Sequence, residues 1–124
     1  MATAYTNATI WTSAGAPIAD GALVVEGPTI VAVGSGIATD GMEQVDCSGM
    51  YLVPGFIDAH VHTGVSGEGA QDDSDTNEMS AAITPYTRTL DAIYPEDIGF
   101  ADARRGGVTT VGVSHGSANP IGGQ

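Results

Sequence analysis

The sequence contains no lysine, and its cationic side chains other than histidine are Arg88, Arg104 and Arg105. Against these three arginines stand 15 aspartates and glutamates, which give a formal net charge of −12 over 124 residues. Such an acidic chain repels a phosphate backbone and lacks the basic clusters that bind anionic lipid. We therefore expect neither nucleic acid nor a membrane surface as a partner. The acidic excess fits either a salt-adapted surface or an ordinary acidic one.

Long apolar runs are also absent. The longest aliphatic stretches, residues 22–25 and 30–33, are far shorter than the ~20 residues of a membrane-spanning helix. The first residues have neither the cationic nor the apolar region of a secretory signal, so we expect a cytoplasmic location. The single cysteine, Cys47, cannot form an internal disulfide, and we expect it to be a small buried apolar residue.

Residues 1–53 have the pattern of short strands separated by turns. Residues 6–12 alternate and are rich in β-branched side chains. Two further β-rich runs, 22–26 and 29–33, flank the turn pair Gly27-Pro28, an arrangement that predicts a hairpin. We expect this part of the chain to be an all-β unit of about four or five short strands.

Residues 54–124 differ in character. Residues 56–63 and 108–113 are rich in β-forming side chains. Pro95 with two acids after it predicts a helix over residues 98–105, because a glycine pair follows directly. A strand, a long crossover containing a helix and a second strand form a βαβ unit, so the two strands should be parallel.

Asp58, His60 and His62 share one face of the first of these strands, because successive side chains on a strand alternate. The opposite face, with Ile57, is apolar and should pack against helices. Two imidazoles at positions i and i+2 can bind one divalent metal. A pair of hydrogen-bonded surface histidines is the alternative. The end of a buried parallel strand favours a metal site, because active sites of barrels collect there.

Residues 54–63, with the sequence Pro-Gly-Phe-Ile-Asp-Ala-His-Val-His-Thr, closely resemble the first barrel strand of the metal-dependent amidohydrolase superfamily. Residues 20–49 resemble the small N-terminal β domain of that family. Further segments are similar to its imidazolonepropionase-related branch, namely residues 84–85, 91–97, 103–111 and 116–123.

The resemblance implies an α/β fold with an all-β part. Residues 1–53 would form the N-terminal half of a small β-sandwich, and residues 54–124 the first βαβ portion of an incomplete (β/α)₈ TIM-like barrel. It also implies that His60 and His62 bind a divalent metal, zinc ahead of iron, and that Asp58 supports these ligands or their strand. The expected reaction is hydrolysis of a non-peptide or cyclic C–N bond in a small amide or cyclic amide substrate.

In the family, further ligands come from later strands: a lysine or glutamate, two more histidines and an aspartate. We expect those residues and the general base beyond residue 124, because a complete barrel needs about 250 residues. The chain is thus expected to be an N-terminal fragment that is inactive alone. The open sheet edges of such a fragment should favour self-association as a homo-oligomer.

His115 and Asn119 follow the second β-rich run of residues 54–124, where a barrel loop would reach the site. His115 stands where the family pattern has a proline. A third metal ligand, a contact to substrate and a solvated loop histidine are the alternatives for His115. Asn119 is a second candidate for contact with substrate or with the loop.

The competing hypothesis is a non-catalytic acidic β-rich binding or structural module. In such a module the histidines are structural, and the acidic loop of residues 72–78 binds calcium. Read as an EF-hand loop that begins at Asp73, the loop has suitable residues at its first, third and fifth positions. However, Glu78 stands at the glycine position and Thr84 at the final glutamate position. We therefore expect a solvated acidic loop rather than an EF-hand.

Overall fold

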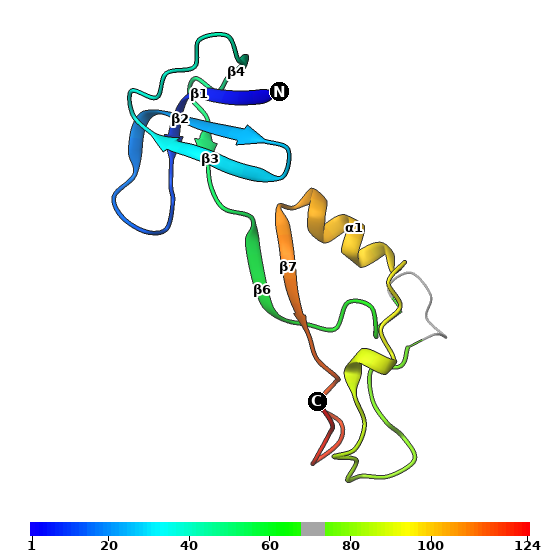
Figure 1. The fold of residues 1–124 in the computed structure, drawn as a ribbon. Coiled ribbons are helices and arrows are strands. Elements are labelled where there is room, and N and C mark those ends of the chain that lie inside the picture. The colour runs from blue at the N-terminus through cyan, green and yellow to red at the C-terminus, as the bar shows by residue number, and fades with distance from the viewer. Residues whose placement is uncertain (68–73) are drawn as a thin grey trace. The chain divides into compact units, whose positions relative to one another are not determined.

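The computed structural model describes residues 1–67 and 74–124, which form two compact units, Met1–Pro54 and Gly55–Gln124 (Figure 1). The first unit consists of strands and their connections. The described residues of the second unit contain a pair of strands, one α-helix, one short 3₁₀ helix and long loops. The chain is therefore a mixed α/β structure in which strands predominate.

The first unit is one five-stranded sheet. Its strands are β1 (Ala2–Ile10), β2 (Ile18–Glu26), β3 (Thr29–Gly34), β4 (Glu43–Asp46) and β5 (Tyr51–Leu52). The order is β3-β2-β1-β4, and β5 also pairs with β1. β2 is antiparallel to β1 and β3, whereas β4 and β5 run parallel to β1. The predicted hairpin is thus present as β2 and β3.

Strand β1 begins at Ala2, earlier than the sequence pattern predicts. The extra residues pair with both neighbouring strands: Ala4 lies opposite Val24 of β2 and Gln44 of β4. Ala4 is completely buried as a result. Alanine has little preference for strands, so only the pairing across the sheet recruits this segment.

The core of the first unit is small. Ala8, Ile10 and Cys47 form a buried cluster. The partly buried side chains of Tyr5, Ile18, Leu23 and Leu52 pack against it. Cys47 is buried and unpaired, as its residue type and lack of a cysteine partner predict. The core of the unit therefore consists mainly of small and aliphatic side chains, with Tyr5 as an aromatic residue at its edge.

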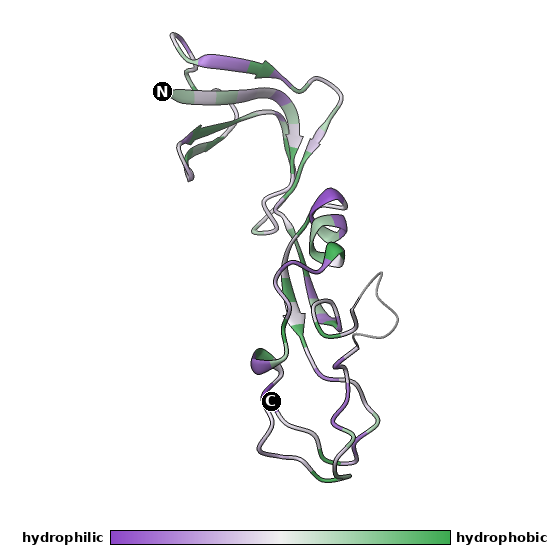
Figure 2. Ribbon diagram, turned by 90° about the vertical axis from the view of Figure 1, so that its right-hand side faces the viewer, coloured by the Kyte–Doolittle hydropathy of each residue, from purple (hydrophilic) through white to green (hydrophobic). Residues whose placement is uncertain are grey.

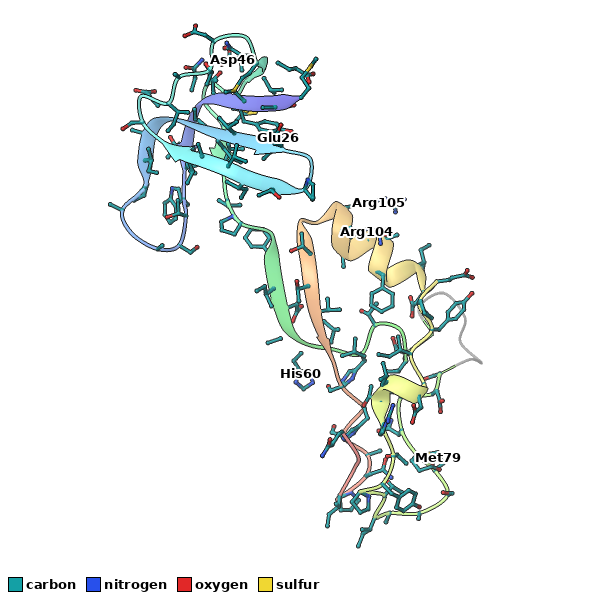
Figure 3. The ribbon with its side chains drawn as sticks, in the orientation of Figure 1. Glu26, Asp46, His60, Met79, Arg104 and Arg105 are labelled. Carbon is teal, nitrogen blue, oxygen red and sulfur yellow. The ribbon has the colours of Figure 1, made fainter. Side chains whose placement is uncertain are left out.

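Asp46, labelled in Figure 3, closes the turn after β4. Its Oδ1 atom accepts hydrogen bonds from the Ser48 hydroxyl at 2.6 Å and from Asn7 Nδ2 at 2.9 Å. These hydrogen bonds, that of the Ser48 hydroxyl above all, lower the pKa of Asp46 below its ordinary value of 3.8. The stabilisation they provide is therefore present at neutral pH and is lost as the pH falls through the lowered pKa.

Replacing Ser48 by alanine is expected to raise the pKa of Asp46 toward its ordinary value, because the largest cause of the lowering is removed. An NMR titration of the Asp46 carboxyl carbon measures this change. Replacing Asn7 by alanine should produce a smaller rise, since its hydrogen bond is the second cause. A pKa that stays the same in Ser48→Ala would contradict the assignment.

The second unit contains β6 (Phe56–Val61), the 3₁₀ helix η1 (Thr89–Asp91), α1 (Ile98–Arg105) and β7 (Val108–Val113). β6 and β7 are parallel neighbours, and α1 lies in the connection between them and packs on β7 (Figure 1). The arrangement agrees with the predicted strand, crossover and parallel strand.

Helix α1 has the bounds that the sequence predicts. Asp97 is its N-cap, and the Asp97 Oδ1 atom accepts the Gly99 N–H at 2.8 Å. Gly106 ends the helix, and Arg104 and Arg105 lie in the last turn, where cations interact favourably with the helix dipole. In the described part of the chain, no helix has the length and apolarity that a membrane span requires.

The apolar face of β6 differs from the prediction. Ile57, which lies on this face, is 73% exposed, and β6 is exposed over most of its length. The expectation that this face packs against helices is therefore wrong for the described residues, because α1 packs against β7 instead. Figure 2 shows hydrophobic segments in both strands of this pair. An uncovered apolar strand face of this kind is suited to contact with further protein.

Candidate metal site

The two histidines of the predicted site lie together at the carboxyl end of β6. His60 is the penultimate residue of β6, and His62 directly follows the strand. Their ring centroids are 5.3 Å apart, with the ring planes at 84° to each other. Figure 3 shows the His60 side chain at this end of the strand. The alternation of strand side chains thus brings both imidazoles to one place, as period two predicts.

The ring of His62 is held by the backbone of the neighbouring strand. Its Nδ1 atom lies 2.8 Å from the carbonyl oxygen of Ser114, the residue directly after β7. A carbonyl oxygen only accepts hydrogen bonds, so Nδ1 carries the hydrogen and donates it. The lone pair then lies on Nε2, the atom free to bind a metal. Metal-binding histidines are commonly oriented by such a bond from their other nitrogen.

The position of the Ser114 carbonyl follows from the parallel pairing. The Ser114 N–H donates to the carbonyl oxygen of Val61 at 3.0 Å, so the pairing of β6 and β7 continues one residue beyond β7. The residue type at position 114 gives no signal for this role, since every amino acid has a backbone carbonyl group. The predicted parallel pairing indicates only that the segment after the second strand lies beside the end of the first.

Asp58 contacts the backbone of a histidine rather than its ring. Its Oδ1 atom accepts the N–H of His60 at 3.2 Å. The pairing of β6 with β7 is irregular between Asp58 and Val61, and this hydrogen bond lies within the irregular segment. Asp58 is therefore placed to support the strand that carries His60, and its role toward a metal stays a prediction.

The donor set fits a divalent metal that prefers imidazole nitrogen, such as zinc. His62 presents Nε2, and the His60 ring lies beside it. Among the described residues, no group of three or more His, Cys, Asp or Glu side chains is placed to hold a metal ion. Catalytic zinc usually has three protein ligands, so the two histidines alone would be an incomplete set for such a site.

His115 has contacts of its own. Its Nδ1 atom lies 2.6 Å from the carbonyl oxygen of Gly116, and its Nε2 atom lies 3.1 Å from that of Gly123. Both ring nitrogens therefore face backbone oxygens of the C-terminal segment. His115 does not join His60 and His62 in a three-residue group within the described residues. Its contact with a metal or substrate stays a prediction.

The side chain of Asn119 connects two loops. Its Nδ2 atom donates to the carbonyl oxygens of Glu78 at 2.7 Å and of Ala81 at 3.0 Å. Both amide hydrogens are thus used within the chain, which leaves the side-chain oxygen for any contact with substrate. That contact also stays a prediction.

The acidic loop can be compared with the calcium hypothesis only in part, since Asp73 lies outside the described residues. Asn77 Oδ1 accepts the N–H of Ala118 at 3.0 Å, and Glu78 Oε1 accepts the N–H of Ser80 at 2.7 Å. The hydrogen bond from the Ser80 backbone lowers the pKa of Glu78. The side-chain oxygens of Asn77 and Glu78 therefore accept hydrogen bonds from backbone N–H groups of the chain itself.

No protein-family model matches the chain. Among curated proteins, the amidohydrolase tasK of Hapsidospora irregularis is 42% identical over 80 residues, which cover 64% of this chain and 8% of the relative. A dihydroorotase of a Wolbachia strain from Drosophila simulans is 38% identical over 89 residues, which cover 70% of this chain and 20% of the relative. The chain thus spans only a small part of the curated relatives that it matches.

The solved structure of an amidohydrolase from Thermotoga maritima is similar over 98% of this chain, with 39% sequence identity and a TM-score of 0.86. The match covers 32% of that protein. It supports a mixed α/β fold, mostly of strands, like the N-terminal domain of amidohydrolases. The relatives are enzymes whose names denote amide hydrolysis, as the sequence resemblance predicts.

Proposed function

We propose that this chain is the N-terminal part of a metal-dependent amidohydrolase that hydrolyses a non-peptide or cyclic C–N bond. His60 and His62 are two ligands of its divalent metal. The substrate is a small amide or cyclic amide, a class to which the names of the relatives also point.

The hydrogen bond from His62 Nδ1 to the Ser114 carbonyl carries the proposal. It selects the tautomer whose Nε2 lone pair is free, and it does so beside a second imidazole at 5.3 Å between ring centroids. A histidine pair with a purely structural role does not require a ring nitrogen with a free lone pair. The pair also lies at the carboxyl end of a parallel strand, where active sites of α/β folds are built.

A divalent metal at this site would polarise the scissile carbonyl and activate water as the nucleophile. In the hydrolysis, water adds its hydroxyl to the carbonyl carbon, the C–N bond breaks, and the nitrogen leaves with a proton. The residues of this chain orient the ligands: the Ser114 carbonyl holds the His62 ring, and Asp58 holds the backbone of His60.

Several finer features belong to the same proposal. The metal is zinc rather than iron, because two imidazoles are typical zinc ligands. The enzyme belongs to the imidazolonepropionase-related branch, and residues 54–124 begin a TIM-like barrel that follows half of a β-sandwich. The remaining ligands and the general base come from outside this chain, which is inactive alone. The protein is cytoplasmic and self-associates through its uncovered apolar strands.

Metal analysis tests the proposal. The purified chain is expected to bind about one zinc ion per molecule, because two oriented imidazoles supply the core of a site. The double variant His60→Ala/His62→Ala should lose this zinc, whereas His115→Ala should keep it. Zinc content is measured by elemental analysis after dialysis against trace zinc.

Zinc content that is equal in the wild type and the double histidine variant would refute the site. Calcium binding measured on the same samples separates the competing hypothesis. Calcium bound tightly with zinc content near zero in both proteins would favour the acidic binding module. Iron in place of zinc would retain the site and change only the metal.

A further inference from the structure

The turn after His62 is connected to the start of α1 by a buried carboxylate. Asp97 is only 5% exposed, and each of its two side-chain oxygens accepts a hydrogen bond from a different backbone amide. Oδ1 accepts the N–H of Gly99 at 2.8 Å, and Oδ2 accepts the N–H of Gly64 at 3.0 Å. The first bond caps the helix, but the second reaches 33 residues back along the chain.

Helix capping alone does not account for this arrangement. A serine or asparagine side chain caps a helix as well as aspartate does, and a single acceptor oxygen is sufficient. Burial of a carboxylate is costly unless its oxygens are hydrogen-bonded. The second oxygen is hydrogen-bonded to Gly64, so the contact with the turn is part of what makes a buried aspartate tolerable here.

Gly64 is two residues from His62, within the turn that fixes that histidine. The His62 carbonyl accepts the N–H groups of Val65 at 3.0 Å and Ser66 at 2.9 Å. The Gly64 carbonyl accepts the N–H of Tyr94 at 2.8 Å. Together with the hydrogen bond to Asp97, the contact with Tyr94 engages both the N–H and the carbonyl group of Gly64. The hydrogen bonds from Val65 and Ser66 engage the carbonyl group of His62.

We propose that Asp97 is a positioning residue for the metal ligand His62. It ties the turn that carries His62 to the N-terminus of α1 and so holds the imidazole in reach of the Ser114 carbonyl. The inference rests on the proposed function of His62 as a ligand. It adds that helix α1 and the metal site are mechanically linked through one carboxylate.

Two substitutions separate capping from positioning. Asp97→Ser keeps a good helix cap for Gly99 but has no oxygen that reaches Gly64. Asp97→Asn has the same shape but offers one acceptor oxygen, so it can satisfy only one of the two amides. Asp102→Asn is the matched control, because it removes a carboxylate from the exposed side of the same helix, where Asp102 pairs only with Arg105 among the described residues.

Amide hydrogen exchange of the full chain is the first measurement. In Asp97→Ser, the exchange of the Gly64 amide is expected to accelerate at least about 10-fold while that of Gly99 stays near the wild-type rate. In Asp97→Asn, one of the two amides should lose protection. In Asp102→Asn, both should keep it. Unchanged Gly64 exchange in Asp97→Ser would overturn the link between Asp97 and the turn.

Zinc affinity, measured by competition with a chelating indicator, is the second measurement. Asp97→Ser and Asp97→Asn should bind zinc about 10–100-fold more weakly, the loss typical for a group that orients a metal ligand. Affinities equal to that of Asp102→Asn would overturn the positioning role. If both Asp97 variants fail to fold by circular dichroism, Asp97 serves the fold as a whole and the proposal is wrong. If the wild type binds no zinc, the proposed metal site fails, whereas the exchange data still test the link.

Discussion

Replacing Gly64 by alanine is expected to destabilise the second unit by about 2–5 kcal/mol. Gly64 has a φ of +89°, a conformation that L-amino acids rarely adopt. An added Cβ would also lie 2.8 Å from Cζ and 2.9 Å from Cε2 of the Phe100 ring. The ring belongs to α1 and is partly buried, so it must shift to admit the added Cβ. Urea unfolding followed by NMR signals of β6 and β7 measures the loss.

Gly107→Ala is a matched control for the Gly64 variant. Gly107 has almost the same φ, +87°, but its added Cβ would lie 3.4 Å from the nearest atom, in Phe56. Backbone strain of about 1–2 kcal/mol is therefore shared by both variants, and the difference between them measures the clash with Phe100. Equal losses in the two variants would contradict the clash. Gly64→Ala should also weaken zinc binding, since the residue lies in the turn of His62.

The substitution Gly112→Ala is expected to force β6 and β7 apart beside the two histidines. An added Cβ would lie 2.6 Å from the carbonyl oxygen of Ala59 and 3.0 Å from its carbonyl carbon, and both atoms belong to the backbone. Backbone atoms cannot rotate aside as a side chain can. We expect a loss of about 1–3 kcal/mol in stability and a zinc affinity that is about 10–100-fold weaker.

Gly106→Ala provides the comparison for Gly112, because its added Cβ would lie 3.4 Å from the nearest atom and its φ is −79°. This variant should unfold at nearly the wild-type urea concentration and bind zinc normally. If Gly112→Ala behaves like Gly106→Ala in both measurements, the close approach of β7 to Ala59 has no part in holding the histidine pair.

Local patterns predicted much of the secondary structure. The run of β-branched residues after Gly107 forms β7, and α1 spans the residues between Asp97 and Gly106 that the proline, acid and glycine signals delimit. These signals succeed because caps and turns are decided by a few neighbouring residues. The start of β1 was missed because Ala2 and its neighbours become a strand only by pairing with β2 and β4.

The burial of β6 was also predicted wrongly. The alternation of Phe56 and Ile57 with their neighbours shows that the strand has two kinds of face, but it does not show what covers them. In the described residues, α1 packs on β7, and Ile57 stays exposed. The periodicity of a strand defines its faces, whereas the partner of each face depends on where distant elements lie.

The spacing of His60 and His62 is enough to predict that they lie together, because residues i and i+2 of a strand share the same face. The groups that hold the two histidines in place are known only from the packing of the strands and the helix. The Ser114 carbonyl, 52 residues from His62, fixes the tautomer of the imidazole, and Asp97, 33 residues from Gly64, fixes the turn. These hydrogen bonds join residues that come into contact only when β6, β7 and α1 pack together. Contacts between residues so far apart in the sequence cannot be predicted from the pattern of neighbouring residues.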